Sequence, residues 1–323
     1  MELDITIHKG ESDSPLAILI HGLGVDKGIW TDPLHTKLLA NNIRLKILAA
    51  EAPLPRISTG INKITIGDFP HKIDNTWSVL KDEGYNLITW SQKRPVGHVD
   101  TAVSELKDIV ARAEELFPGS PVALIGHSRG GLIARKFMEE KNHPAVKALI
   151  TIASPHSGSS ISKIAGYLSP LAAVLKRILP EEEQGTIIET VSRTTDFLLG
   201  EALKELMPDS EFFKGLKDSR NKDIKYISFG GTEPRLLTLY QWKKNGNEMY
   251  PSPLIEIPSS LIKLLPSSLK LAELTPGKGD ALVSAESSVM PWSSDHYDLP
   301  ANHVSIMWNR EVIQKTIEVL KKI

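Results

Sequence analysis

The sequence predicts an α/β fold in which a mostly parallel central sheet is flanked by helices. Apolar runs at residues 16–20 and 121–125, with a further expected buried strand at 146–153, suit parallel strands that are covered on both faces. Residues 101–117 carry apolar side chains at helical spacing, which predicts an amphipathic helix between two of these strands. A glycine-flanked serine at 126–130 directly follows the second run, as at a sharp strand-to-helix turn. Alternating strands and helices imply right-handed crossovers and therefore a parallel sheet.

The first third of the chain repeats this alternation. Pro33 suits the first turn of a helix, and Gly84 suits the end of another. In chain order we expect a strand at 16–20, a helix at 31–42, a strand at 45–49, a loop or a loop with a small hairpin at 51–74, a helix at 75–82 and a strand at 85–90.

Two segments interrupt the alternation in the rest of the chain. Residues 157–220 have the pattern of several helices, and residues 233–275 are rich in proline and serine with scattered apolar pairs. We therefore predict a single domain over residues 1–323 that carries insertions at 157–220 and 233–275. Around them we expect a helix at 131–138, strands at 146–153 and 224–229, and a terminal helix at 310–322.

Composition limits the classes of partner and site. The 323 residues carry a formal net charge of -1, with 38 Lys and Arg against 39 Asp and Glu, so we expect no nucleic-acid partner. The absence of cysteine excludes disulfides, thiolate metal ligands and a cysteine nucleophile. The N-terminus lacks signal-peptide features, and the most apolar candidate span, 161–179, is interrupted by polar and charged residues. We therefore expect a cytoplasmic protein without a transmembrane segment.

Ser128 is the predicted nucleophile. Its segment, Gly126-His127-Ser128-Arg129-Gly130, lies between an apolar strand and a helix, where a tightly approached backbone needs residues without bulky side chains. Such a turn lifts the hydroxyl clear of the sheet. It also places the N–H of Arg129 where it can donate to an oxyanion.

A serine nucleophile needs a base, and four histidines follow Ser128 in the chain. His303 lies directly before the C-terminal helix, where chain order places the base, and His296 is the second choice over His143 and His156. The alternative interpretation of His303 is a surface histidine that caps the last helix.

The base needs a carboxylate that fixes its tautomer. Asp280 follows a glycine and precedes an apolar run, as expected of an acid on a loop anchored in the core. It could instead be a turn-forming aspartate, and Glu286, Asp295 and Asp298 are alternative acids.

The loop after the first predicted strand, His21-Gly22-Leu23-Gly24, offers a second oxyanion donor in the backbone N–H of Leu23. We expect His21 to bind loop backbone and His127 to pack. The Arg129 side chain could meet an anionic group or, as we favour, pair with a nearby carboxylate.

These ordered motifs resemble the α/β-hydrolase superfamily, in its bacterial lipase and lipase-like esterase branch. Segment 21–24 is similar to the family's oxyanion loop and segment 126–131 to its nucleophile elbow, while segments 279–283 and 302–303 resemble its acid and histidine segments. Segments 153–159 and 230–234 are similar to the strand ends that lie between them. The resemblance implies an α/β-hydrolase fold with a helical lid, and an enzyme without a cofactor.

The sequence departs from that branch at two points. Secreted members place a calcium-binding aspartate two residues after the catalytic histidine, where this chain has Ser305. The family's disulfide is also missing. The resemblance therefore implies no metal site and an intracellular relative.

The two insertions are expected to shape the substrate site. We expect 157–220 to form a cap over Ser128, although its apolar stripe could simply extend the core. That stripe comprises Ile161, Ile164, Leu168, Leu171, Ala172, Val174, Leu175 and Ile178. The second insertion would add Leu236, Leu237, Leu239, Tyr240 and Trp242 to the same wall.

The sequence thus predicts a serine esterase or lipase for small-molecule or lipid esters, with transient contact to a lipid surface as a further expectation. The fold also carries thioesterases, inositol deacylases and haloperoxidase-like enzymes, so a specialised lipid-linked ester, a thioester or an amide is an alternative substrate. A binding module that keeps the fold without catalysis is the alternative from another class.

Overall fold

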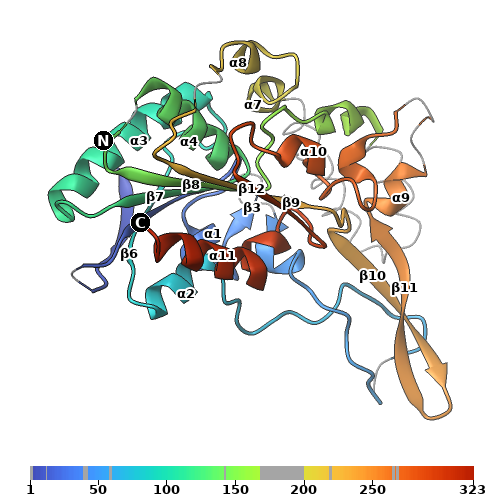
Figure 1. The fold of residues 1–323 in the computed structure, drawn as a ribbon. Coiled ribbons are helices and arrows are strands. Elements are labelled where there is room, and N and C mark those ends of the chain that lie inside the picture. The colour runs from blue at the N-terminus through green and yellow to red at the C-terminus, as the bar shows by residue number, and fades with distance from the viewer. Residues whose placement is uncertain are drawn as a thin grey trace.

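A seven-stranded sheet forms the centre of the molecule, with helices on both faces (Figure 1). The computed structural model describes residues 3–11, 13–38, 43–57, 60–141, 143–167, 200–217, 220–263, 266 and 269–323. The strands run, in sheet order, β1 (Asp4–His8), β6 (Asn86–Ser91), β2 (Leu16–Ile20), β7 (Val122–His127), β8 (Val146–Ile152), β9 (Lys225–Gly231) and β12 (Asp295–Leu299). All neighbours pair in parallel except β1 with β6, which confirms the predicted α/β fold.

The two faces of the sheet bury different helices. Leu16, Ile18 and Ile20 of β2 pack with α3 (Val99–Leu116) and α4 (Arg129–Glu140), whereas Ala17 and Leu19 belong to the opposite core. That second core includes side chains of α1 (Gly28–Thr31), α2 (Thr76–Asp82) and α11 (Arg310–Leu320). Because successive strand residues point to opposite faces, a continuous apolar run is needed to fill both cores.

The expected helix at 31–42 and the expected strand at 45–49 are both wrong. Helix α1 ends at Thr31, because Asp32 precedes Pro33, which disfavours helical backbone, and it adopts φ -154° and ψ 69°. The chain then forms the short strand pair β3 (Lys37–Leu38) and β4 (Ile43–Arg44). Residues 45–47 form a 3₁₀ helix, η1 (Leu45–Ile47), and Leu45 packs on the face of the sheet instead of joining it.

A second, three-stranded sheet projects from the body of the molecule (Figure 1). Strands β10 (Leu237–Asn245) and β11 (Glu248–Ile257) form a long hairpin within the second insertion, and β5 (Ile64–Thr65) pairs with β10. Within residues 51–74, Glu51 and Asp68 form an isolated antiparallel bridge, but β5 pairs with β10 and not with another part of the segment. Ile64 and Thr65 form the third strand of a sheet whose other two strands come more than 170 residues later in the chain.

The described part of the 157–220 segment contains η2 (Ile161–Tyr167), α7 (Glu201–Glu205) and α8 (Glu211–Lys214). Ile161 and Ile164 of the expected apolar stripe are buried. Its other members, Leu168, Leu171, Ala172, Val174, Leu175 and Ile178, lie outside the described residues. The remaining short helices are α9 (Ser259–Ile262), η3 (Ala272–Leu274), α10 (Ala285–Ser288) and η4 (Ser305–Trp308). Within the described ranges, no helix is long and apolar enough to cross a bilayer.

Candidate active site

Ser128 occupies a strained turn between β7 and α4. Its backbone has φ 54° and ψ -128°, a region that side-chain-bearing residues rarely adopt. The turn is fixed by a hydrogen bond from the Ser128 N–H to the Ile152 carbonyl (2.8 Å) and by one from the Gly131 N–H to the Ser128 carbonyl (3.0 Å). Ser128 is partly exposed, while the residues on either side of it are buried. The strain therefore presents one hydroxyl at the carboxyl edge of the sheet.

The glycines around Ser128 are sterically required. A Cβ at Gly126 would lie 2.4 Å from the Gly131 nitrogen, and one at Gly130 would lie 2.3 Å from the Ile20 carbonyl oxygen. Backbone atoms cannot yield to such contacts as a flexible side chain can. The G-x-S-x-G pattern thus reflects close packing of α4 against β2 and β7.

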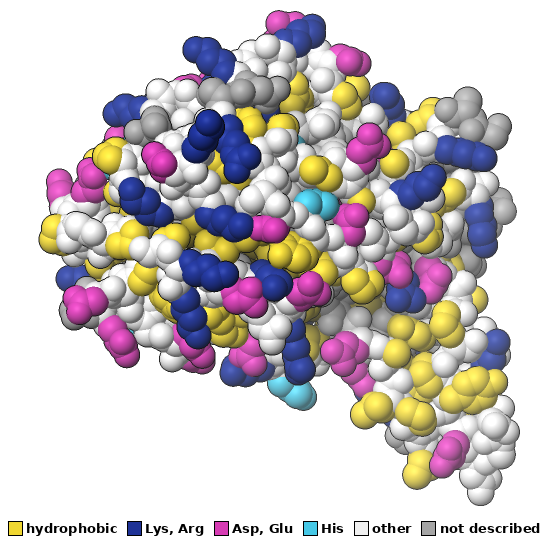
Figure 2. All heavy atoms as spheres, in the orientation of Figure 1, with side chains coloured by type: hydrophobic (Ala, Val, Ile, Leu, Met, Phe, Trp, Pro, Cys, Tyr) yellow, Lys and Arg dark blue, Asp and Glu magenta, His cyan; other side chains and the backbone are white. Residues whose placement is uncertain are grey.

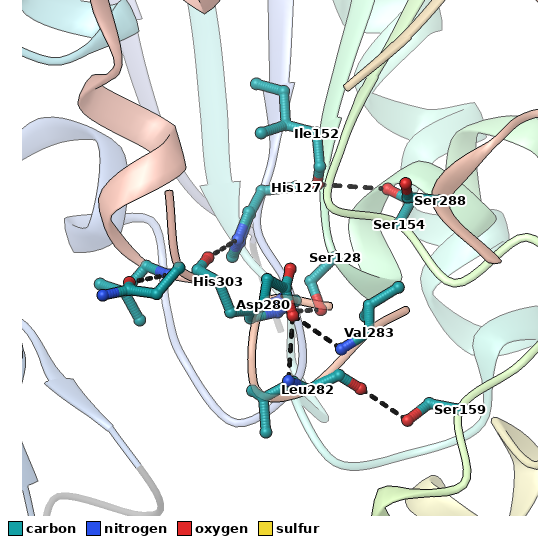
Figure 3. Close-up of polar contacts among 12 residues, drawn as sticks. His127, Ser128, Ile152, Ser154, Ser159, Asp280, Leu282, Val283, Ser288 and His303 are labelled. Atoms are coloured by element: carbon teal, nitrogen blue, oxygen red, sulfur yellow. Dashed lines mark hydrogen bonds and ion pairs between the residues drawn. The ribbon is translucent and has the colours of Figure 1, made fainter. Parts of the chain in front are cut away.

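His303 connects Ser128 to Asp280. Its Nε2 lies 3.0 Å from the Ser128 Oγ, and its Nδ1 lies 2.8 Å from the Asp280 Oδ2 (Figure 3). The other carboxylate oxygen of Asp280 accepts the N–H groups of Leu282 (2.9 Å) and Val283 (2.7 Å). Asp280 is 1% exposed and His303 4% exposed. The structure therefore brings Ser128 together with two residues that follow it in the chain by more than 150 positions.

The alternative bases and acids lie elsewhere. His296 is bonded to Ser228 and Asp298, and the buried His156 to the Thr151 hydroxyl. His143 faces Glu114. Asp295 pairs with Lys225 on the outer strands, and Glu286 is exposed on α10.

The loop after β2 lies against the serine. A Cβ on Gly22 would lie 2.9 Å from the Ser128 Cβ, so the loop backbone directly adjoins the nucleophile turn. Within the described residues, the backbone N–H groups of Leu23 and Arg129 have no hydrogen-bond acceptor. Two unpaired donors beside a serine hydroxyl match the requirement of an oxyanion site.

The arrangement has counterparts among known proteins. Residues 93–191 match a family model described as the PGAP1-like alpha/beta domain. The mature form of the Bacillus licheniformis lipase BlEst2 superposes on this chain with a TM-score of 0.53 at 15% sequence identity, covering 98% of this chain and 97% of that chain. The chain has the α/β-hydrolase fold.

Two further solved structures resemble this chain. The propeptide form of the same lipase gives a TM-score of 0.54 at 14% identity and covers 98% of this chain and 53% of that chain. A lipase-esterase related protein from Clostridium acetobutylicum gives 0.48 at 13% identity over 98% of both chains. No curated protein matches by sequence.

Among the described residues, the Arg129 side chain pairs with no carboxylate, contrary to the favoured expectation. It is fully buried and donates to the amide oxygen of Gln92 (2.9 Å) and to the carbonyls of Pro95 (3.2 Å) and Gly97 (2.8 Å). Burial lowers its pKa to about 10. Gln92 in turn donates to the carbonyl of His21 (2.9 Å). In this α/β-hydrolase fold, Arg129 thus ties the nucleophile turn to the loop that carries Leu23.

Gln92 was missed in the sequence because it belongs to no motif. Its position two residues after the strand predicted at 85–90, at the edge of the sheet where the site lies, is the available signal. Its backbone N–H donates to Nε2 of His21 (3.0 Å), whose Nδ1 therefore carries the proton that reaches the Gly22 carbonyl (2.9 Å). His21 binds loop backbone, as expected.

His127 does more than pack. Its Nε2 donates to the carbonyl oxygen of His303 (2.8 Å), and the two rings lie 4.9 Å apart. Asn302 holds the same loop from the other side, because its Oδ1 accepts the N–H groups of Val304 and Ser305 and its Nδ2 donates to the Arg235 carbonyl. Ser305 caps this turn by accepting the N–H of Asn302. Within the described part of the chain, no group of three or more acidic or histidine side chains could hold a metal ion.

The buried histidines predict an acid-sensitive fold. Burial lowers the pKa of His21 to about 4 and that of His127 to about 3, so both remain neutral when folded. Below about pH 6.5 the unfolded chain binds protons that the folded chain excludes, so stability falls as the pH falls. We expect each histidine to cost about 2 kcal/mol of unfolding free energy between pH 7.5 and pH 5.

Denaturant unfolding of wild type and of His127→Gln at both pH values measures this effect. The variant should be less stable than wild type at pH 7.5, because the hydrogen bond to His303 is weakened. Between pH 7.5 and pH 5, however, its free energy of unfolding should fall by about 2 kcal/mol less than that of wild type. An equal loss in both proteins would contradict the assignment.

Proposed function

We propose that the chain is a serine hydrolase of carboxylic esters. The hydrogen-bonded series Ser128–His303–Asp280 at a strained strand-to-helix turn carries this proposal. His303 accepts the hydroxyl proton as the Ser128 oxygen attacks the ester carbonyl, and Asp280 stabilises the resulting imidazolium. The N–H groups of Leu23 and Arg129 donate to the tetrahedral oxyanion. His303 then protonates the leaving alcohol, and water hydrolyses the acyl-enzyme in a second, equivalent cycle.

An apolar cluster beside the site supports a lipophilic acyl group. Buried side chains from α4 and from both insertions pack together, and Leu23 and Leu282 of the site loops lie against them. The buried members are Leu132, Ile161, Ile164, Leu203, Leu206, Leu239, Ile255 and Leu274. We propose one α/β-hydrolase domain over 1–323, with 157–220 as a cap and 233–275 as a second insertion beside the site. Ser159 joins the cap segment to the acid loop through its hydrogen bond to the Leu282 carbonyl (2.6 Å, Figure 3).

A series of p-nitrophenyl esters from acetate to palmitate tests this proposal. We expect kcat/KM to rise by about tenfold or more from acetate to a medium-length chain, because each added methylene that is buried contributes roughly 0.8 kcal/mol to transition-state binding. A maximum at acetate would contradict the apolar acyl site while leaving ester hydrolysis intact.

Labelling with a fluorophosphonate separates the remaining alternatives. Labelling of Ser128 without hydrolysis of any p-nitrophenyl ester would favour a specialised lipid-linked ester, a thioester or an amide. A folded protein that is neither labelled nor active would favour the binding module and overturn the proposed hydrolase.

A further inference from the structure

The projecting sheet ends in a cluster of exposed apolar side chains. Ile57 is 87% exposed, Leu54 73%, Ile61 60% and Tyr250 40%. They come from three segments that backbone bonds hold at the far end of the hairpin, since Arg56 pairs with Met249 and the N–H of Asn62 donates to the Trp242 carbonyl. Figure 2 shows hydrophobic side chains gathered on this projection at the lower right of the molecule. We call these four side chains, with Lys63, Lys243 and Lys244, the arm tip.

The charge of the arm tip is positive. Lys63, Lys243 and Lys244 are exposed at the same level of the hairpin, and none of the ion pairs among the described residues involves them. The acidic side chain nearest in the hairpin is Glu248, beside the turn. Exposed aliphatic and tyrosine side chains interleaved with uncompensated lysines suit an interface between water and anionic headgroups.

The edge of the sheet is closed to another strand. Met249 exchanges two backbone hydrogen bonds with Arg56 on the side of β11 that faces away from β10. Every second residue along β11 from Met249 therefore points its backbone N–H and C=O groups to this outer side. Two of those alternate positions are Pro251 and Pro253, which have no N–H to donate. A second copy or an extended peptide therefore cannot add to this edge by continuous pairing.

The arm is also anchored beside the candidate site. Leu239 and Ile255, near the base of the hairpin, pack in the apolar cluster that Leu23 contacts. The carbonyl of Arg235, two residues before β10, accepts the amide of Asn302, the neighbour of His303. The hairpin thus extends outward from the edge of the molecule where Ser128 is presented.

We propose that the arm tip docks the protein on an anionic lipid surface. Ile57, Ile61 and Leu54 enter the headgroup region, and the three lysines contact lipid phosphates and carboxylates. This inference goes beyond the proposed hydrolysis, and it is tested by binding alone.

Co-sedimentation of the full chain with lipid vesicles tests the docking. One vesicle type is phosphatidylcholine alone, and in the other about a third of the lipid is phosphatidylserine. We expect wild type to partition onto the anionic vesicles at least about tenfold more strongly. Lys243→Gln/Lys244→Gln should remove most of the preference for anionic vesicles, at about fivefold in partitioning per lysine. Ile57→Ser/Ile61→Ser should weaken partitioning to both vesicle types by about tenfold.

Matched variants away from the arm are the controls. Ile7→Ser/Val289→Ser removes apolar side chains of 39% and 40% exposure, and Lys321→Gln/Lys322→Gln removes two exposed lysines. Both should bind vesicles as wild type does, and all variants should hydrolyse a short, soluble ester equally. Wild type that stays in solution with both vesicle types would overturn the proposal, as would arm variants that bind normally. Loss of vesicle binding in the control variants would also overturn it. So would the finding that wild type self-associates without binding vesicles and that the arm variants abolish this self-association.

Discussion

Ser128→Ala is expected to lower kcat for p-nitrophenyl esters by about 10⁴- to 10⁶-fold, since the substitution removes the atom that forms the acyl-enzyme. Stability should change little. Alanine adopts the same strained backbone at about the same cost as serine, and among the described residues the one side-chain bond lost is that to His303. A hydrogen bond of this kind contributes about 1 kcal/mol. Thermal unfolding and steady-state kinetics, measured side by side, therefore separate the nucleophile from a structural residue.

Ser154→Ala is the matched control for that experiment. Ser154 is buried next to α4, and within the described part of the chain its hydroxyl makes a single, long contact of 3.5 Å with the Ile152 carbonyl. It should keep activity within about twofold of wild type, because it touches neither His303 nor the expected oxyanion position. Ser128→Ala enzyme that still forms an acyl-enzyme would refute the assignment of the nucleophile.

The sequence is most informative where one local pattern meets a single physical requirement. Strands β2 and β7 are apolar and β8 is mostly so, which requires helices on both faces of the sheet, and all three are central strands. The glycines around Ser128 likewise indicate a tight turn, because a Cβ at Gly126 or Gly130 would lie less than 2.5 Å from backbone atoms. Chain order predicts which histidine and aspartate belong with Ser128, and in the structure His303 contacts both Ser128 and Asp280.

Prediction fails where the stabilising contact is distant in sequence and the segment is polar. Strand β12 has the sequence DHYDL and forms only because β9 offers an open edge beside it. β5 forms only against β10. Gln92 and Asn302 hold the site through backbone groups of His21 and Arg235, 71 and 67 residues away. A pattern within a short window carries no record of such partners, so these residues become visible only in three dimensions.

The carboxylate of Asp280 has two separate roles, and they can be tested separately. Its Oδ1 accepts the N–H groups of Leu282 and Val283 and thereby closes the loop, while its Oδ2 faces Nδ1 of His303. The backbone N–H of His303 also donates to the Asp280 carbonyl (2.9 Å), so the loop and the base remain linked whatever the side chain. A change that replaces only the second oxygen should leave the loop folded.

Asp280→Asn makes that change, and we expect it to lower kcat by about 10⁴-fold. The amide oxygen can keep both bonds to the loop, but the amide nitrogen then donates to Nδ1 of His303. The proton of the neutral imidazole moves to Nε2, which can no longer accept the proton of Ser128. Asp298→Asn, at the carboxylate that faces His296, is the control and should retain activity. If Asp280→Asn remained within tenfold of wild type while keeping its fold, orientation of His303 by Asp280 would not be part of the mechanism.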